Sequence, residues 1–370
     1  MLRTPSTKPK EIVVIGGGAI GSMTAWHLAR NGHQVLLIDP LLKNRFTQTE
    51  PLNGSTASLG VLMGNIFRRS SGRSWRLRRR SIKLWRQWIS LLNTPQTPLK
   101  LESPLVQLAS SESEALFMAE LSKTRKHLGV EVFTKAIALQ SQRLWPTNDY
   151  GGLISHEDGR INPLQLHKCL FNALQKNDVD QLDDEVILIE RTSNTSKKKW
   201  HIHLKNGQPL TKEIVIICAA MGSDALVKPL GHNLPIAPVL GQVMDLEIKA
   251  DQKNWSGWPA VLISEGINLI PYATNRILLG ATLEPGTKKN TEYLKQIKNM
   301  NGNAPKWIQD SSIKNQWSGI RGRPIARPAP ILTTLEPGLI IATGHYRNGI
   351  LLAPASAEWV VDTIDKEESL

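Results

Sequence analysis

The feature that most constrains the fold is a glycine-rich turn near the start of the chain. Gly16, Gly18 and Gly21 follow a short apolar run and open an amphipathic segment, and a second apolar run over residues 35–38 ends at Asp39. This order of strand, glycine turn, helix and strand, closed by an acidic residue, is typical of a βαβ unit that binds a dinucleotide. We therefore expect a Rossmann-like domain in which Asp39 accepts hydrogen bonds from the adenosine ribose.

Each glycine of the turn has its own expected role. Gly16 permits the tight turn, Gly18 lets the backbone approach the pyrophosphate, and Gly21 lets the helix pack close to the strand. The helix then begins at Ala19 and Ile20, and its N-terminus offers unpaired N–H groups and a positive dipole to the phosphates. The motif by itself does not distinguish NAD from FAD.

Length and composition describe a globular protein of more than one domain. The chain has 370 residues, of which 41% are hydrophobic and 21% charged, and two of them are cysteines, Cys169 and Cys218. Two cysteines exclude a disulfide framework and favour the reducing cytoplasm. The first ten residues hold no apolar run of the secretory type, and no stretch reaches the roughly 18 apolar residues of a membrane span.

The formal net charge of +13 is concentrated locally. Residues 68–86 hold nine arginines and lysines and no acid, and apolar residues recur at helical spacing over 74–92. The pattern indicates an amphipathic helix with a solvated cationic face. A contact with an anionic membrane surface or an acidic partner stays open. We expect no nucleic-acid partner, because no recognition motif accompanies the charge.

The rest of the chain alternates between α/β pattern and strand-rich insertions. Strand-like runs separated by Gly, Pro and Asn fill 238–282, which favours an antiparallel sheet. The expected fold class is therefore mixed α/β and α+β, with a substrate domain interleaved into a discontinuous cofactor domain. The expected cofactor domain comprises 10–92, 152–237 and 318–365, and the expected substrate domain comprises 93–151 and 238–317.

Five further segments and the C-terminal stretch resemble, in order, motifs of the FAD-dependent D-amino acid oxidase family, in particular its glycine oxidase-like members. The C-terminal stretch, 344–354, reads GHYRNGILLAP. The other segments are 158–163 (DGRINP), 214–223 (IVIICAAMGS), 238–242 (PVLGQ), 280–282 (GAT) and 317–321 (WSGIR). The resemblance covers about residues 11 to 365 and implies noncovalently bound FAD.

The resemblance also implies where the flavin lies. Gly344, Asn348, Gly349 and Ile350 would line its ring, and a last helix that begins at Gly349 would direct its positive end toward the charge that reduction places there. The backbone of Val186 would meet the adenine. Gly222, in the 214–223 motif, belongs to the same expected cofactor site.

Substrate recognition is expected to depend on arginine. By resemblance Arg321 binds the substrate carboxylate and Arg347 is a second arginine of the same site, and a guanidinium suits that task because it binds carboxylate bidentately. The implied reaction is oxidation of a small amino acid or amine (glycine, sarcosine or a D-amino acid) to an imine and then a 2-oxo acid. Dioxygen is reduced to hydrogen peroxide. Hydride transfer to flavin from a neutral amine requires no acid or base side chain.

Several positions depart from the family's motifs. Asn268 stands where relatives have an aromatic residue, Leu240 where they have arginine, and Gly322 where they have proline. Because Arg323 lies close to Arg321 in the sequence, either of these two arginines could face inward. The chemistry is thus better defined than the substrate.

Alternative functions also stay open. A quinone-linked D-amino acid dehydrogenase would use 74–92 as its membrane contact, while a flavin-binding protein with an altered pocket would have lost catalysis. An NAD-dependent dehydrogenase would purify without colour. His201 and His203 share one face of a strand without a third ligand, so we expect no metal. The sequence does not fix the amino acid, the oligomeric state, or a role in thiamine-thiazole biosynthesis rather than catabolism.

Overall fold

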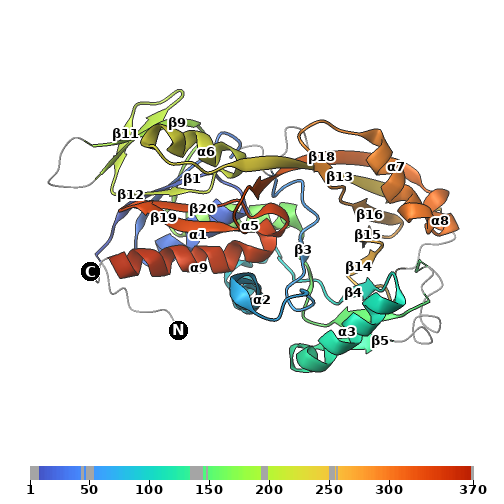
Figure 1. Cartoon of the computed structure of the whole chain (residues 1–370). Helices are drawn as coiled ribbons and strands as arrows, with labels where there is room; N and C mark the ends of the chain where they lie inside the picture. Colours follow the sequence, from blue (N-terminus) through green and yellow to red (C-terminus); the bar gives the residue numbers. More distant parts are fainter. Residues whose placement is uncertain are drawn as a thin grey trace.

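The chain folds into two parts, each organised around one β-sheet (Figure 1). The computed structural model describes residues 8–42, 46, 54–133, 145–146, 149–192, 199–249, 255 and 257–367. One part contains a six-stranded sheet with strand order β19-β20-β12-β1-β2-β8. The other contains a nine-stranded sheet with strand order β17-β13-β16-β15-β14-β4-β6-β5, in which β18 also pairs with β13.

The six-stranded sheet gathers strands from three distant stretches of the chain. Strand β1 lies between β2 and β12, parallel to both, and β19 is antiparallel to β20 at one edge. The bounds are β1 Glu11–Ile15, β2 Gln34–Ile38, β8 Asp180–Leu182, β12 Ile214–Ile217, β19 Ile331–Glu336 and β20 Leu339–Thr343. The central strands β12 and β20 are buried throughout, as expected for parallel strands that are covered on both faces.

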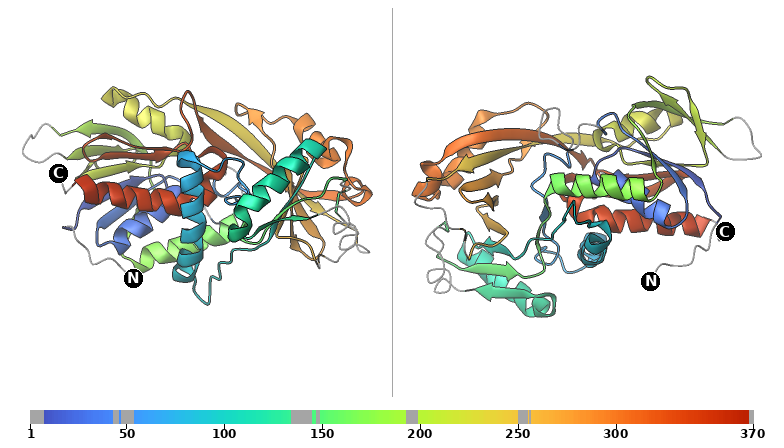
Figure 2. Two further views of the ribbon diagram at one scale, coloured as in Figure 1. Left: turned by 60° about the horizontal axis from the view of Figure 1, so that its bottom comes forward. Right: turned by 180° about the vertical axis from the view of Figure 1, so that it is seen from behind.

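Helices cover one face of this sheet and a smaller sheet covers the other. Helices α1 (Ala19–Arg30), α5 (Pro163–Lys176) and α9 (Gly349–Glu367) pack together below the sheet (Figures 1 and 2). The opposite face packs against a three-stranded sheet formed by β9 (Val186–Arg191), β10 (Trp200–Leu204) and β11 (Leu210–Lys212). The Rossmann-like βαβ unit and the last helix from Gly349 are confirmed.

The nine-stranded sheet is mainly antiparallel, as the sequence predicted. Its two longest strands, β13 (Ile236–Glu247) and β18 (Ser312–Pro324), pair from end to end and extend toward the six-stranded sheet (Figure 1). The other strands are β4 Leu105–Leu108, β5 Val130–Phe133, β6 Gly152–Ser155, β14 Val261–Ser264, β15 Ile267–Ala273, β16 Arg276–Gly280 and β17 Glu284–Pro285. The mixed fold class is confirmed, while the domain boundaries given above stay a prediction.

Short elements complete the two parts. A two-stranded sheet of β3 (Val61–Leu62) and β7 (Gly159–Arg160) lies between them. Among the described residues, further helices are α3 Glu112–Arg125, α6 Ser223–Val227, α7 Thr291–Asn299 and α8 Lys306–Gln309, with short 3-10 turns at Lys126–Leu128, Ala220–Gly222, Lys228–Leu230, Met300–Gly302 and Tyr346–Asn348.

The basic segment forms helix α2 (Gly72–Leu92), which packs against α9. Several of its cationic side chains have partners within the protein. Arg80 forms an ion pair with Glu358, Arg86 forms one with Glu157, and the guanidinium of Arg79 lies 5.3 Å from the ring centroid of Trp75. Within the described part of the chain, no helix has both the length and the apolar character needed to cross a bilayer.

Candidate active site

A single cleft of about 1070 Å³ runs between the two sheets. Its volume is at the upper end for ligand pockets. One end is formed by the glycine turn, and the other by the turn before α9. The predicted site residues that line it are Gly16, Gly18, Ala19, Ile20, Asp39, Val186, Gly222, Arg321, Gly344, Arg347, Asn348, Gly349 and Ile350. The structure therefore brings together residues from both ends of the chain, and their individual roles stay predictions.

The glycine turn is packed so closely that side chains would not fit. A Cβ on Gly16, where φ is +106°, would lie 2.6 Å from the Cys218 carbonyl oxygen, and one on Gly21 would lie 1.8 Å from the Gly16 carbonyl oxygen. Gly21 therefore lies behind the turn, where it permits the close packing predicted for it. At Gly18, by contrast, a Cβ would meet only the hydroxyl of Ser55, at 3.2 Å, so this backbone faces the cleft.

Two polar side chains fix the turn from the cleft side. The Asp39 carboxylate accepts hydrogen bonds from the backbone N–H groups of Gly17 (2.6 Å) and Leu41 (2.7 Å). The Ser55 hydroxyl accepts one from the N–H of Ala19 at 3.0 Å, at the start of α1. Ser55 was missed as a site residue, because its position at this helix end depends on a contact across 36 residues.

The opposite end of the cleft is the start of α9. Gly344 adopts a φ of +64°, and a Cβ added at Gly349 would meet no atom within 4 Å, so the helix begins against open space. His345 is packed beneath the turn, with Nε2 2.8 Å from the Ser356 hydroxyl, and burial lowers its pKa to about 3. A neutral, buried histidine fits a packing role better than proton transfer.

Arg321 projects from β18 into the cleft, where backbone groups hold it. Its Nη1 donates to the carbonyl oxygens of Thr282 (3.0 Å) and Leu240 (3.3 Å). The guanidinium lies directly over Gly241, where a Cβ would come within 2.1 Å of Nη2. Burial lowers the pKa of Arg321 to about 10, and the nearby charge of Arg347 contributes. The side chain remains charged at neutral pH.

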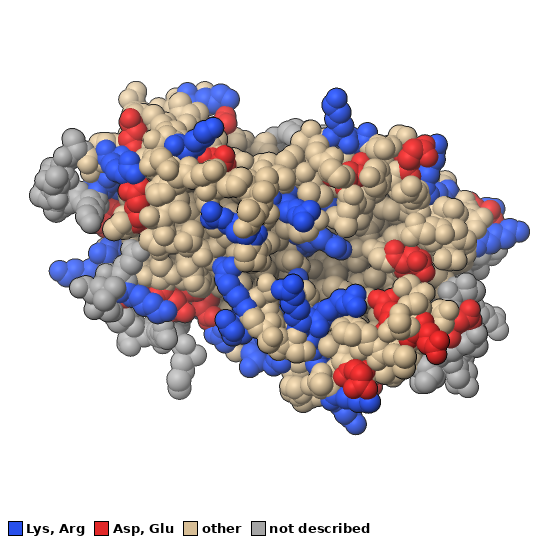
Figure 3. All heavy atoms as spheres, in the orientation of Figure 1, with Lys and Arg blue, Asp and Glu red and all other residues tan. Residues whose placement is uncertain are grey.

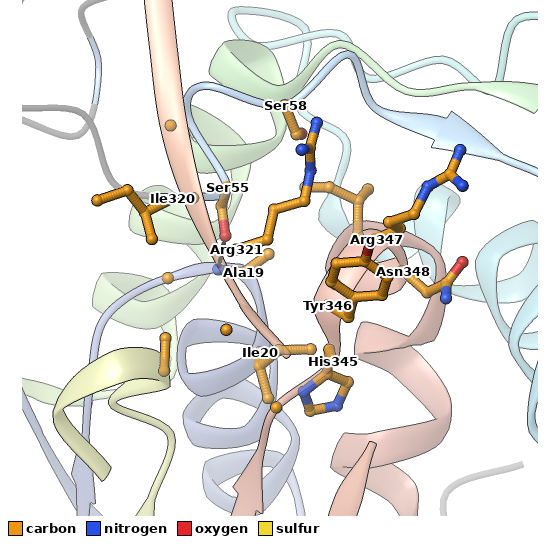
Figure 4. A pocket seen from close by; sticks show the side chains of 18 of the residues that line it. Ala19, Ile20, Ser55, Ser58, Ile320, Arg321, His345, Tyr346, Arg347 and Asn348 are labelled. Carbon is orange, nitrogen blue, oxygen red and sulfur yellow. Dashed lines mark hydrogen bonds between the residues drawn. The ribbon is translucent and has the colours of Figure 1, made fainter. Parts of the chain in front are cut away.

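The arginines of the cleft form one cationic region. In Figure 4 the side chains of Arg321 and Arg347 extend in the same direction, beyond the ring of Tyr346. Figure 3 shows lysines and arginines gathered around the hollow at the middle of this face. Arg323, two residues along β18, is exposed, and its guanidinium lies 5.9 Å from the Tyr346 ring centroid. Arg321 is therefore the arginine of this strand that lines the cleft.

The cleft also contains an arginine that was not predicted. Arg78 of α2 lines the cleft and donates from Nη2 to Asn348 Oδ1 at 2.9 Å. A signal for it existed in the sequence, since Arg78 precedes Ile82 by four residues and Trp85 by seven, which places it on the apolar face of α2. The high density of arginines in this segment obscured that spacing.

The departures from the family's motifs fall partly on the cleft wall. Asn268 lines the cleft near Gln107 and Ile263, and its Nδ2 donates to the Gly280 carbonyl at 2.8 Å. An amide thus occupies the wall at the position where the resemblance led us to expect an aromatic ring. This substitution makes the wall more polar and less bulky.

His201 and His203 do not belong to a metal centre in the part of the chain that is described. Among the described residues no group of three His, Cys, Asp or Glu side chains is arranged to hold an ion. His203 Nε2 lies 2.7 Å from Glu190 Oε2, and His201 Nδ1 lies 3.0 Å from Thr211 Oγ1.

The geometry fits FAD. A glycine cradle at a helix start suits the diphosphate, a cleft of this size accommodates a dinucleotide, and the second helix start faces open space. A family model described as FAD dependent oxidoreductase matches residues 11–363. The chain belongs to this family of FAD-dependent oxidoreductases, and FAD is its cofactor.

Within the family the chain is similar to glycine oxidases. It is 25% identical to the glycine oxidase of Geobacillus kaustophilus, over 97% of this chain and 94% of that protein. The crystal structure of glycine oxidase from that organism superposes with a TM-score of 0.81, covering 97% of this chain and 95% of that one. The bifunctional protein ThiO/ThiG of Nostoc sp. is 28% identical over 97% of this chain, which spans 53% of that relative's length. The chain is thus an FAD-dependent oxidoreductase of the glycine oxidase type, which confirms the family, enzyme class and cofactor predicted from the sequence.

Proposed function

We propose that this protein oxidises a small amino acid or amine of the glycine, sarcosine or D-amino acid class. The product is an imine, which water hydrolyses to a 2-oxo acid and ammonia, or to methylamine and the oxo acid in the case of sarcosine. The two electrons pass to dioxygen, which is reduced to hydrogen peroxide. The similarity to glycine oxidases over nearly the whole chain supports this proposal.

The observation that carries the proposal is the pairing of Arg321 with Arg347 in the cleft that also contains the start of α9. A carboxylate between two guanidinium groups is held by charge-assisted hydrogen bonds. The backbone carbonyls of Leu240 and Thr282 orient Arg321 before a substrate arrives. Holding the carboxylate in this way directs the α-carbon of a small amino acid toward the expected ring site at Asn348 and Gly349.

The roles assigned to the cofactor-binding residues belong to the same proposal. Gly16, Gly18, Ala19, Ile20 and Asp39 would hold the diphosphate and ribose, with Gly21 behind them, while Val186 and Gly222 would line the adenine half. Gly344, Asn348, Gly349 and Ile350 would surround the ring. Bound FAD supplies the hydride acceptor. The start of α9 would then stabilise negative charge at the ring through the N–H groups and dipole of its first turn.

We also propose that FAD is bound noncovalently. Cys218 lines the cleft, but burial raises the pKa of its thiol to about 12, and the thiol hydrogen-bonds to Thr24. A protonated, buried thiol is a poor nucleophile. Acid precipitation followed by absorbance of the supernatant tests this point, because noncovalent FAD is released and covalent flavin is not.

The test of the function is a spectrum of the purified protein followed by anaerobic addition of glycine, sarcosine, D-alanine and, as a control, L-alanine. Loss of the flavin band with one of the first three compounds, and peroxide formation on admitting air, is the expected result. R321M should lose most of this reaction. R323M is its matched control, because Arg323 lies on the same strand outside the cleft lining. A protein that keeps its flavin band with all amino acids would contradict the proposal.

The electron acceptor and cellular location complete the proposal. We propose dioxygen as the electron acceptor and the cytoplasm as the location. The location is supported by two cysteines that are both free. The quinone-linked alternative requires α2 to bind a membrane, yet Arg78, Arg80 and Arg86 of that helix have partners within the protein. Flotation with anionic liposomes and the yield of peroxide per amino acid oxidised separate the two acceptors. Sedimentation measures whether the protein is a homo-oligomer.

A further inference from the structure

Arg78 has a position unlike that of its neighbours in the arginine run of α2. Its exposed fraction is 8%, whereas Arg76 and Arg80, one on each side of it, are exposed. The side chain crosses from α2 to the wall of the cleft. A buried arginine is uncommon unless its charge has a partner, so the groups that surround Arg78 decide how its charge is balanced.

The groups in contact with Arg78 are neutral. Nη1 donates to the Met63 carbonyl oxygen at 2.6 Å, Nη2 donates to Asn348 Oδ1 at 2.9 Å, and the guanidinium lies 4.0 Å from the ring centroid of Phe67. Among the described residues, no carboxylate lies within ion-pair distance of it. These contacts satisfy hydrogen bonding but, within the described part of the chain, leave the charge without a counter-ion in direct contact.

Asp158, the acid whose charge acts on Arg78, makes its hydrogen bonds elsewhere. Asp158 is fully buried, and its carboxylate accepts hydrogen bonds from the backbone N–H groups of Gly64, Asn65 and Ile66. It raises the pKa of Arg78, but the larger effect of burial lowers that pKa to about 10, and the charge of Arg347 lowers it further. Arg78 therefore remains a cation at neutral pH.

A buried cation without a counter-ion costs free energy in the empty protein and becomes favourable when an anion enters the same cleft. Under the proposed function, negative charge would reach the α9 end of the cleft from two sources: the substrate carboxylate, which Arg321 and Arg347 would bind, and the flavin ring when it is reduced. Arg78 contacts Asn348, the residue immediately before α9. It thus stands next to the helix start assigned to the ring rather than beside Arg321.

We propose that Arg78 is a further residue of the reaction, which stabilises the negative charge on the flavin ring when two electrons are transferred to it. The proposal rests on the function proposed above, because it assigns the ring to the start of α9. Arg78 then adds a full charge to the partial charge of the helix N-terminus. A purely structural role, in which Arg78 joins α2 to Met63 and Asn348, predicts lower thermal stability without any change in the flavin's potential.

The test compares R78M, which removes the charge at similar volume, with R78K, which keeps it. R79M is the matched control, because Arg79 is the next residue of α2 and stacks on Trp75. The two-electron midpoint potential of bound FAD is measured by equilibration with a reference dye, and FAD affinity and melting temperature are measured on the same samples. We expect R78M to shift the equilibrium at least tenfold toward oxidised flavin, equivalent to about 30 mV for a two-electron couple. R78K and R79M should stay within threefold of the parent protein.

An unchanged potential in R78M overturns the proposal, as does an equal fall in R78M and R78K, which would assign the effect to geometry rather than charge. If R78M does not fold, R78Q takes its place, since its amide retains a donor for Met63 or Asn348 and lacks the charge. The dye measurement needs no substrate. If no amino acid reduces the flavin, the proposed function fails while the Arg78 measurement still stands, so the two failures are distinguishable.

Discussion

The clearest prediction concerns the glycine that lies against the guanidinium of Arg321. Gly241 lies in β13 opposite Gly319 of β18, and a Cβ added to it would lie 2.1 Å from Nη2, 2.3 Å from Nη1 and 2.4 Å from Cζ of Arg321. The two strands are fixed by their pairing, whereas the end of an arginine side chain is flexible. Gly241→Ala should therefore displace the guanidinium of Arg321 and leave the sheet intact.

The size of the effect follows from what Arg321 loses. Displacement of the guanidinium removes its hydrogen bonds to the carbonyls of Thr282 and Leu240. The guanidinium then loses the orientation in which it would bind a substrate carboxylate. Hydrogen bonds to charged groups contribute about 1.5–3 kcal/mol, which corresponds to a fall in kcat/KM of roughly 10- to 150-fold. Most of the change should appear as a higher KM, because the carboxylate is held equally in the ground and transition states.

The assay is the initial rate of peroxide formation as a function of substrate concentration. G241A is compared with R321M and with R323M, whose KM should stay within about threefold of the parent value because an exposed charge at this distance is screened. FAD content and melting temperature should be close to the parent values in all three variants. An unchanged KM in G241A, together with a raised KM in R321M, would refute the idea that Gly241 positions Arg321.

The remaining predictions concern the cofactor cradle and a buried acid. Gly21→Ala would place a Cβ 1.8 Å from a backbone oxygen that cannot move aside, so the purified variant should lack FAD, measured as the ratio of flavin to protein absorbance. Ser55→Ala removes the hydroxyl at the start of α1 and should weaken FAD binding by about 5-fold, measured by fluorescence quenching of added FAD. Burial raises the pKa of Asp158 from 3.8 to about 6, so its contribution to stability is present below pH 4 and is lost as the pH rises through 6. Relative to Asp158→Asn, the parent protein should lose about 3 kcal/mol of unfolding free energy between pH 4 and pH 7.5 in urea titrations, and parallel pH profiles would contradict this.

The elements that the sequence predicted well are those whose information is local. The βαβ unit, the helix from Gly349 and the strand Trp200–Leu204 are each encoded by a short run of apolar residues bounded by turn residues. The pairing of strands from distant segments could not be predicted as well from the sequence. The end-to-end pairing of β13 with β18, which brings Gly241 under Arg321, depends on packing across about 80 residues of intervening chain, as the hydrogen bond from Arg321 to Leu240 illustrates.

The site residues that lie in local sequence motifs were likewise predicted, whereas those positioned by long-range contacts were not. Residues in the glycine turn and in the 344–354 motif were identified from their order along the chain, and the structure brings them to one cleft. Ser55 and Arg78 were not identified. Ser55 acquires its position through Ala19, 36 residues away, which spacing does not reveal. The spacing of Arg78 to Ile82 and Trp85 placed it on the apolar face of α2, but gave no indication of its partner Asn348.

The arginine run of α2 shows that a count of charged residues is misleading when it is not known which of their side chains are buried. Nine cationic residues between 68 and 86 predicted an amphipathic helix with a solvated cationic face and left open a contact with anions outside the protein. In the folded protein Arg80 and Arg86 pair with acids of neighbouring elements, and Arg78 points inward to the cleft. An inward cation without a counter-ion is costly unless an anion shares its cavity, so its presence argues for a site in which negative charge develops. The same residue that weakens the case for a membrane surface therefore strengthens the case for redox chemistry at the start of α9.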